Sequence, residues 1–254
     1  MSAPLVLFGW HAVSARLRRH AGSVHVVYVD HHRQDTRVRE VIALATSAHI
    51  ELQAVEAARL DALSSGGHHQ GVVAVGEARA PGDLDDVLGT IRGDPLLLVL
   101  DGITDPHNLG ACLRSADAMG VHAVIAPKDR SAPLTPTVYK VASGAAESVP
   151  YLLVTNLARS LRSLKDQGIW IAGTDGEAED SVFAARFNGP LALVLGAEGS
   201  GMRRLTREHC DTLVSVPMLG AVESLNVSVA AGILLFEIQR QRNAEQTRDA
   251  ALSR

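Results

Sequence analysis

The sequence has few cysteines, few aromatic residues and no long apolar run. Cys112 and Cys210 are the two cysteines in 254 residues, and aromatic residues make up 4%. Two widely separated cysteines indicate free thiols in a reducing compartment and exclude a disulfide scaffold. No run approaches the roughly 18 apolar residues that a membrane span needs, and the first residues lack the basic segment and cleavage site of a signal peptide. We therefore expect a soluble cytoplasmic protein that binds no membrane.

Several motifs of familiar enzyme classes are also missing. There is no phosphate loop, and the glycines of Gly-Ala-Glu-Gly-Ser-Gly at 196–201 lack the spacing of the dinucleotide fingerprint. No GxSxG supports a serine hydrolase. His68 and His69 are adjacent and neither cysteine has a partner at CxxC distance, so no metal site is predicted.

The charge balance alone does not favour nucleic acid, because the formal net charge is −4. Phosphate contacts need a local basic patch rather than a basic chain. Of the 24 cationic residues, 21 are arginine, which suits bidentate phosphate contacts. The candidate RNA contacts lie in the first 33 residues, where a solvated surface role is the alternative for each: Arg16, Arg18, Arg19, His31, His32 and Arg33.

Two domains are expected. Residues 1–77 alternate short helices and strands, with helices at 9–19, 37–47 and 57–63 and strands at 24–29, 50–55 and 71–76, which predicts a small α/β domain. Residues 78–95 contain the breakers Pro81-Gly82 and Gly93-Asp94-Pro95 around one short helix at 83–91, and we place the linker there. Residues 96–254 form the second domain.

The second domain repeats the pattern of strand then helix. Buried-type apolar runs at 96–100, 123–126, 169–173, 191–195 and 212–216 indicate a parallel sheet covered on both faces. Ligands of such sheets bind at the carboxyl ends of the strands. Three polar or glycine-rich stretches begin at such ends, at Asp101, Gly196 and Pro217. Their shared position predicts one ligand site.

The last of these stretches organises the chain. Pro217 ends a strand because it cannot donate to a sheet ladder, and Gly220 permits a tight turn. Ser224 or Asn226 then caps a helix over 227–242. Both side chains could equally bind a ligand. We expect the polar tail after Arg242 to be frayed.

The three stretches resemble, in order, the signature motifs of the SpoU (TrmH) class of ribose 2′-O-methyltransferases. The first is LDGITDPHNLGACLRSADAMGVHAVI at 100–125, the second LVLGAEGSGM at 193–202, and the third VPMLGAVESLNVSVAAG at 216–232. HHQGVVA at 68–74 and KVASGAAESVP at 140–150 bring the match close to the branch that methylates a guanosine of 23S rRNA.

The resemblance implies a fold and an activity. The expected fold is a ribosomal-protein-like α/β domain for RNA recognition followed by a SPOUT-type parallel-sheet methyltransferase domain, with a trefoil knot at about 191–240. The expected transferase moves a methyl group from S-adenosyl-L-methionine to 23S rRNA, as free RNA or in a pre-ribosomal large subunit, and acts as a homodimer. Alternatives are a ribose methyltransferase of tRNA or of a drug site in rRNA, or a non-catalytic rRNA-binding assembly factor.

The resemblance also assigns cofactor contacts. Gly196, Val216 and Leu225 are expected first, then Met218, with Gly199 allowing close approach of the backbone. The apolar side chains could sandwich an adenine, although packing in the core would explain Val216 and Leu225 as well.

For the chemistry, the resemblance points to Asn108, Arg114, Glu198, Ser224 and Asn226. In the family the matching arginine acts on the 2′-hydroxyl. A guanidinium keeps its charge near neutral pH, so we favour a clamp that binds phosphate and stabilises alkoxide charge over a general base. A structural ion pair of Arg114 with Glu198 or Asp117 is the alternative. We interpret Asp101 and Asp105 as turn formers.

Overall fold

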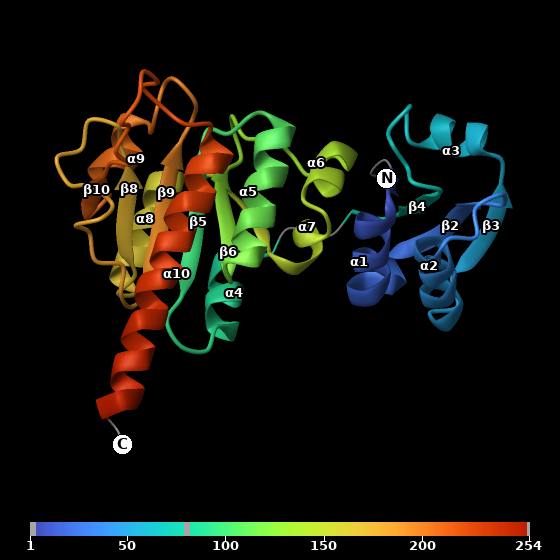
Figure 1. The fold of residues 1–254 in the computed structure, drawn as a ribbon, viewed down its shortest axis with the longest axis horizontal. Coiled ribbons are helices and arrows are strands. Elements are labelled where there is room, and N and C mark those ends of the chain that lie inside the picture. The colour runs from blue at the N-terminus through green and yellow to red at the C-terminus, as the bar shows by residue number, and fades with distance from the viewer. Residues whose placement is uncertain (1–3, 79–81, 253–254) are drawn as a thin grey trace. The chain divides into compact units, whose positions relative to one another are not determined.

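The computed structural model describes residues 4–78 and 82–252, apart from the side chains of 249–252. The chain divides into two compact units. The first contains Met1–Ala80 and Leu134–Ser148, and the second contains Pro81–Pro133 and Val149–Arg254. The contact-defined units therefore differ from the expected domains at residues 134–148, which group with the first unit. Figure 1 shows the elements of each unit.

The first unit has a mixed four-stranded sheet in the order β1-β4-β2-β3. Strand β4 is antiparallel to β1 and β2, whereas β2 and β3 are parallel. Leu60 of α3 packs with Phe8 and Val73 on the sheet. The elements are β1 (Leu5–Phe8), α1 (Trp10–His20), a 3-10 turn (Ala21–Ser23), β2 (Val24–Asp30), α2 (Thr36–Ser47), β3 (Glu51–Val55), α3 (Ala57–Leu63), β4 (Val72–Gly76), α6 (Pro136–Val141) and α7 (Ala145–Ser148).

Arg16 lies in the interior of this unit, which corrects its expected role as an RNA contact. Only 1% of the residue is exposed. Its Nε donates to Oε1 of Glu147 at 2.9 Å, and its Nη1 donates to Ser23 Oγ and to the carbonyl of Glu77. Its Nη2 contacts the hydroxyl of Tyr139. Every nitrogen of the guanidinium therefore has a partner in the same unit. A buried ion pair of this kind is expensive to break.

The second unit has a six-stranded sheet in the order β10-β8-β9-β5-β6-β7, and every pairing is parallel. The expected parallel sheet is therefore confirmed. Its elements are α4 (Leu84–Thr90), β5 (Leu96–Asp101), α5 (Pro106–Ala118), β6 (Ala123–Pro127), β7 (Tyr151–Val154), α8 (Leu157–Asp166), β8 (Trp170–Thr174), β9 (Leu191–Gly196), α9 (Arg204–Glu208), β10 (Thr212–Val214) and α10 (Val227–Leu252).

Helices cover both faces of this sheet. Leu157, Leu161 and Leu164 of α8 share a buried core with Val99 and Val194 of the central strands, and α4 packs against the same core. Helices α5 and α10 cross the other face side by side (Figure 1). The central strands are apolar on both faces because both are covered.

Two expectations about the C-terminal part need correction. Strand β10 ends at Val214 rather than at residue 216, and Ser215 forms only an isolated bridge with Ser181. Helix α10 continues to Leu252 where a frayed tail was expected, because residues 243–252 consist mostly of helix formers such as Ala, Glu, Gln and Arg. Among the described helices, even the 26-residue α10 has no stretch apolar enough to span a bilayer. The trefoil knot stays a prediction of the resemblance.

Candidate active site

A cavity of about 820 Å³ opens at the carboxyl ends of β8, β9 and β10 in the second unit. Its walls are the residues that follow those strands, 174–177, 195–202 and 214–218, together with 223–225 and the first turns of α10. The cavity therefore lies where a parallel sheet is expected to bind its ligand, and its size is typical of small-molecule sites.

All five expected cofactor contacts line this cavity. Gly196 and Gly199 come from the loop after β9, whereas Val216, Met218 and Leu225 come from the segment between β10 and α10. Val216, Met218 and Leu225 are each partly exposed, so they present apolar surface to the cavity rather than filling the core.

The loop after β9 folds back on itself at Gly196. Ala197 and Gly201 exchange two backbone hydrogen bonds, of 3.1 and 2.9 Å. A Cβ atom on Gly196 would lie 2.2 Å from both the carbonyl carbon of Gly201 and the backbone nitrogen of Met202. Any side chain at 196 would therefore push the loop open. The loop gives backbone groups to this wall of the cavity, together with the side chain of Glu198.

Asp101 fixes the far end of the same loop, which corrects its interpretation as a turn former. The side chain of this last residue of β5 is fully buried. Its carboxylate accepts from the backbone nitrogen of Arg203 at 2.9 Å and from Arg203 Nε at 2.6 Å. Asp105, by contrast, caps α5 by accepting from the backbone nitrogen of His107. The first motif is thus connected by a charge-assisted clamp to the residue that directly follows the second motif.

Asn108, Glu198 and Asn226 form one hydrogen-bonded cluster. Glu198 Oε1 accepts from Asn108 Nδ2 at 3.1 Å, from Asn226 Nδ2 at 2.7 Å and from the backbone nitrogen of Val227 at 3.3 Å. Asn226 Nδ2 also donates to Asn108 Oδ1 at 2.9 Å. The structure therefore brings one predicted catalytic residue from each motif together. Glu198 also lines the cavity.

Asn226 and Ser224 have different positions. Asn226 Oδ1 accepts from the backbone nitrogen of Ser228 at 2.9 Å, so Asn226 caps α10 while its amide nitrogen holds Glu198. Ser224 is exposed and lines the cavity. Of the two candidates, Asn226 is the cap, and Ser224 lines the cavity.

Arg114 is separate from this cluster. It is exposed on α5 and does not line the cavity. In the part of the chain that the structure describes, Arg114 forms no hydrogen bond and no ion pair. The alternative of a structural pair with Glu198 or Asp117 is therefore not seen, and the guanidinium is free to bind another molecule.

The charge of the cavity favours a cationic ligand. Four carboxylates line it, those of Asp175, Glu177, Glu198 and Glu223, against a single guanidinium, that of Arg207. Arg207 is paired with Asp175 at 2.7 Å. Sequence reasoning missed the segment 174–177, although it follows the buried run 169–173 and so occupies a strand end like the three motifs.

The remaining RNA candidates lie on the surface of the first unit. Arg18 pairs with Glu40, Arg33 with Asp35, and both His31 and His32 with Glu56. Exposed Arg19 has no hydrogen-bond or ion-pair partner among the described residues, so it is the candidate whose charge is least compensated.

Comparisons with known proteins agree with this picture. Residues 95–236 match the SpoU rRNA methylase family, and residues 6–81 match the domain described as RNA 2′-O ribose methyltransferase substrate binding. A protein of Ralstonia nicotianae named 23S rRNA (guanosine-2′-O-)-methyltransferase RlmB is 57% identical over 96% of this chain and 98% of its own length. The protein of that name from Neisseria meningitidis is 56% identical over 93% of this chain and 95% of its own length.

Solved structures show the same fold. The SpoU methyltransferase AviRb from Streptomyces viridochromogenes superposes with a TM-score of 0.81 at 28% identity, covering 95% of this chain and 91% of that one. AviRb in complex with the cofactor AdoMet gives a TM-score of 0.78 at 28% identity, over 94% of this chain and 90% of that one. Sequence motifs, cavity and neighbours thus lead to one conclusion: the chain belongs to the SpoU rRNA methylase family.

Proposed function

We propose that this protein transfers the methyl group of S-adenosyl-L-methionine to the ribose 2′-hydroxyl of a guanosine in 23S rRNA. One observation carries the proposal. The second and third motifs line a single cavity and the first is hydrogen-bonded to both through Asn108, in a chain that aligns over nearly its whole length with relatives named for this reaction.

The residues of the cavity fit the cofactor. When bound, S-adenosyl-L-methionine supplies an electrophilic methyl group on a positively charged sulfur. The excess of carboxylates favours a cation. Val216, Met218 and Leu225 offer apolar contacts to a flat base, and the loop closed at Gly196 offers backbone donors and acceptors.

The cluster positions the reacting groups. Glu198 is held by both asparagines and by the first backbone nitrogen of α10, so the second motif cannot move without the other two. Ser224 lines the cavity, and in this proposal it binds the ribose or the cofactor. A fixed arrangement lowers the barrier by aligning the 2′-oxygen with the methyl carbon.

Arg114 binds the substrate in this account. Its guanidinium stays charged near neutral pH, so it clamps a phosphate and stabilises the charge that develops on the 2′-oxygen. Since Arg114 lies outside the cavity of its own chain, we favour an arrangement in which a second copy contributes it.

The protein acts as a homodimer in this proposal. Helix α10 exposes the apolar side chains of Val229, Ile233 and Phe236, at 48, 42 and 60%, on one stripe of the helix. The loop before it adds the exposed Leu219 and Val222. An apolar surface of this kind, next to the cavity, is suited to a second copy of the chain.

The first unit recognises the RNA. Arg18, Arg19 and Arg33 are exposed and suited to phosphate contacts. We propose 23S rRNA, free or in an assembling large subunit in the cytoplasm, as the partner.

Methyl transfer from labelled cofactor to free 23S rRNA, to pre-ribosomal particles and to bulk tRNA, in separate reactions followed by nucleoside analysis, tests the function. We expect label in 2′-O-methylguanosine of 23S rRNA alone. Label in tRNA would overturn the substrate. Absence of label from free rRNA and pre-ribosomal particles alike, with the cofactor still bound, would favour a non-catalytic assembly factor.

A further inference from the structure

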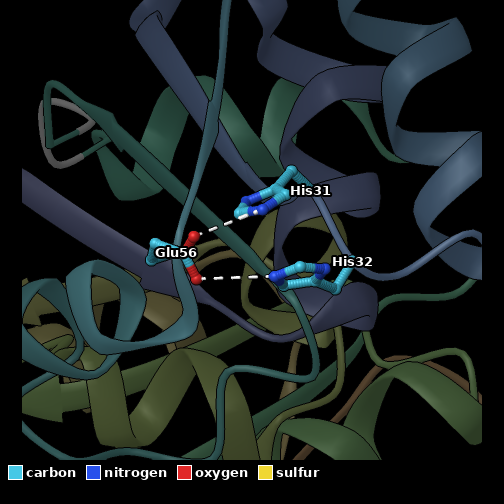
Figure 2. A group of neighbouring side chains, drawn as sticks. All are labelled: His31, His32 and Glu56. Carbon is cyan, nitrogen blue, oxygen red and sulfur yellow. Dashed lines mark ion pairs between the residues drawn. The ribbon is translucent and has the colours of Figure 1, made fainter.

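Three side chains that commonly bind metals converge at one edge of the first unit's sheet (Figure 2). His31 and His32 directly follow β2, and Glu56 directly follows β3. Because β2 and β3 are parallel neighbours, their carboxyl ends lie side by side. One donor atom of each residue lies within 4.8 Å of the donor atoms of the other two.

The spacing suits a single ion. Nε2 of His31 lies 3.3 Å from Oε1 of Glu56, and Nε2 of His32 lies 3.6 Å from Oε2. Ligands at about 2.1 Å from a tetrahedral zinc ion are about 3.4 Å apart. The two nitrogens face different oxygens of one carboxylate, so rotation of these exposed side chains would bring both imidazoles and the carboxylate to one ion.

The tautomer of His31 also suits a metal. Its Nδ1 lies 3.0 Å from the carbonyl oxygen of Val55. A carbonyl only accepts, so Nδ1 carries the hydrogen and Nε2 of the neutral ring presents a lone pair to Glu56. Two electron-rich atoms 3.3 Å apart repel unless a proton or a metal ion lies between them. Metal-binding histidines are typically held in this way through their other ring nitrogen.

The loop that carries the histidines is shaped in advance. The buried Asp30 accepts from the backbone nitrogen of His32 through Oδ1 at 2.9 Å, and its carbonyl accepts from Arg33 at 3.1 Å. Arg33 itself pairs with Asp35 at 2.8 Å. Within the described chain no lysine or arginine pairs with Glu56, so its carboxylate remains available for a cation.

We propose that His31, His32 and Glu56 bind one Zn²⁺ ion, with water completing the coordination of this exposed site. Two imidazoles and one carboxylate suit Zn²⁺ and neighbouring transition ions rather than Mg²⁺ or Ca²⁺. The spacing in the sequence predicts no such site, because the third ligand comes from another strand. The ion ties the loop after β2 to the start of α3 and so orders the loop that carries Arg33. In the metal-bound protein, His31 is a ligand rather than an RNA contact.

Calorimetric titration of the full-length, tag-free protein with Zn²⁺ near neutral pH tests the site. We expect one ion per chain, and weakening by roughly tenfold or more in His32→Ala and in Glu56→Gln. His25→Ala is the matched control, because His25 is an exposed histidine of the same unit that pairs with Glu77; it should bind like wild type. All three substitutions change exposed side chains, and equal melting temperatures in chelator would show that each variant folds.

Nitrogen NMR of the histidine rings provides an independent readout. The site predicts that Zn²⁺ shifts the Nε2 resonances of both His31 and His32. Binding that is equal in wild type, His32→Ala and Glu56→Gln would overturn the site. The site would also be overturned if the His31 ring carries both protons near neutral pH and does not respond to Zn²⁺. His31 and Glu56 would then be joined by a hydrogen bond rather than by a metal ion.

Discussion

The amide nitrogen of Asn226 donates a hydrogen bond of 2.9 Å to Oδ1 of Asn108, although 118 positions separate the two residues. The same nitrogen donates to Oε1 of Glu198, which also accepts from Asn108 Nδ2. Because a carboxylate oxygen only accepts, both amides have a single orientation that satisfies the cluster. The three motifs are therefore fixed relative to one another before any ligand binds.

Replacing Asn226 with aspartate should disable the enzyme. Asn226→Asp places a second carboxylate against Glu198 at a contact of 2.7 Å and removes the shared donor. We expect kcat/KM for methyl transfer to fall roughly 100-fold or more, as for other misplaced catalytic groups. Ser228→Ala is the control, because Ser228 Oγ donates to Asn226 Oδ1 and its loss leaves the bond from Asn226 Nδ2 to Glu198 in place; it should stay within a few-fold of wild type. Near-normal activity of Asn226→Asp would remove the cluster from the catalytic site.

Arg114→Ala should abolish methyl transfer while leaving the affinity for S-adenosyl-L-methionine within a few-fold, because Arg114 does not line the cavity. Activity assays and calorimetry measure the two effects separately. An equal loss of both would place Arg114 at the cofactor instead.

Mixing inactive variants tests whether a second copy contributes Arg114. If it does, Arg114→Ala mixed with Asn226→Asp should regain part of the activity, because half of the sites in a mixed dimer combine an intact Arg114 with an intact cluster. No recovery, with subunit exchange shown separately, would mean that Arg114 acts within its own chain.

Arg16 should matter for stability rather than for RNA binding. Arg16→Ala leaves the fully buried Glu147 carboxylate without its partner, which costs about 3–5 kcal/mol in comparable pairs. Urea unfolding of the first unit, followed by Trp10 fluorescence in a Trp170→Phe background, measures the change. The exposed Arg19→Ala should alter stability by less than about 0.5 kcal/mol. A small effect of Arg16→Ala would mean that the pair is not buried in solution.

Both thiols should react slowly with alkylating reagents. Burial, assisted by the charge of Glu198, raises the pKa of Cys112 from 9.0 to about 12. Burial is also the main cause of the rise at Cys210, where Asp211 adds to it and the pKa again reaches about 12. Near pH 8 each thiolate is about 1,000-fold scarcer than in an unfolded chain. Iodoacetamide labelling should be correspondingly slow in the native protein and rise with pH; rapid labelling of native Cys112 would contradict its burial.

Periodicity predicted most elements, because buried strands and capped helices leave local patterns. Helix α3 spans the predicted 57–63, and the second unit's sheet is parallel as expected. The four-residue strands β1 and β7 were missed. The three motifs pointed to strand ends, and the cavity lies at the ends of β9 and β10, where the second and third motifs begin. The first motif, after β5, contacts this site through Asn108.

Long-range contacts were not predictable. From the sequence, Arg16 belongs to the basic end of a surface helix. Only its pairing with Glu147, 131 positions away, shows that it is buried. Glu147 belongs to residues 134–148, which group with the first unit. Likewise, Asp101 next to a proline-containing turn gives no sign of its clamp on Arg203. For both Arg16 and Asp101, the error came from assigning a local role to a residue whose partner is distant in sequence.

The most direct test is mass spectrometry of ribose methylation in 23S rRNA from cells that lack this protein. We predict that one guanosine loses its 2′-O-methyl group and regains it when the wild-type chain is supplied, but not when Asn226→Asp is supplied. An unchanged methylation pattern in 23S rRNA, or full restoration by Asn226→Asp, would contradict the proposed function of the site.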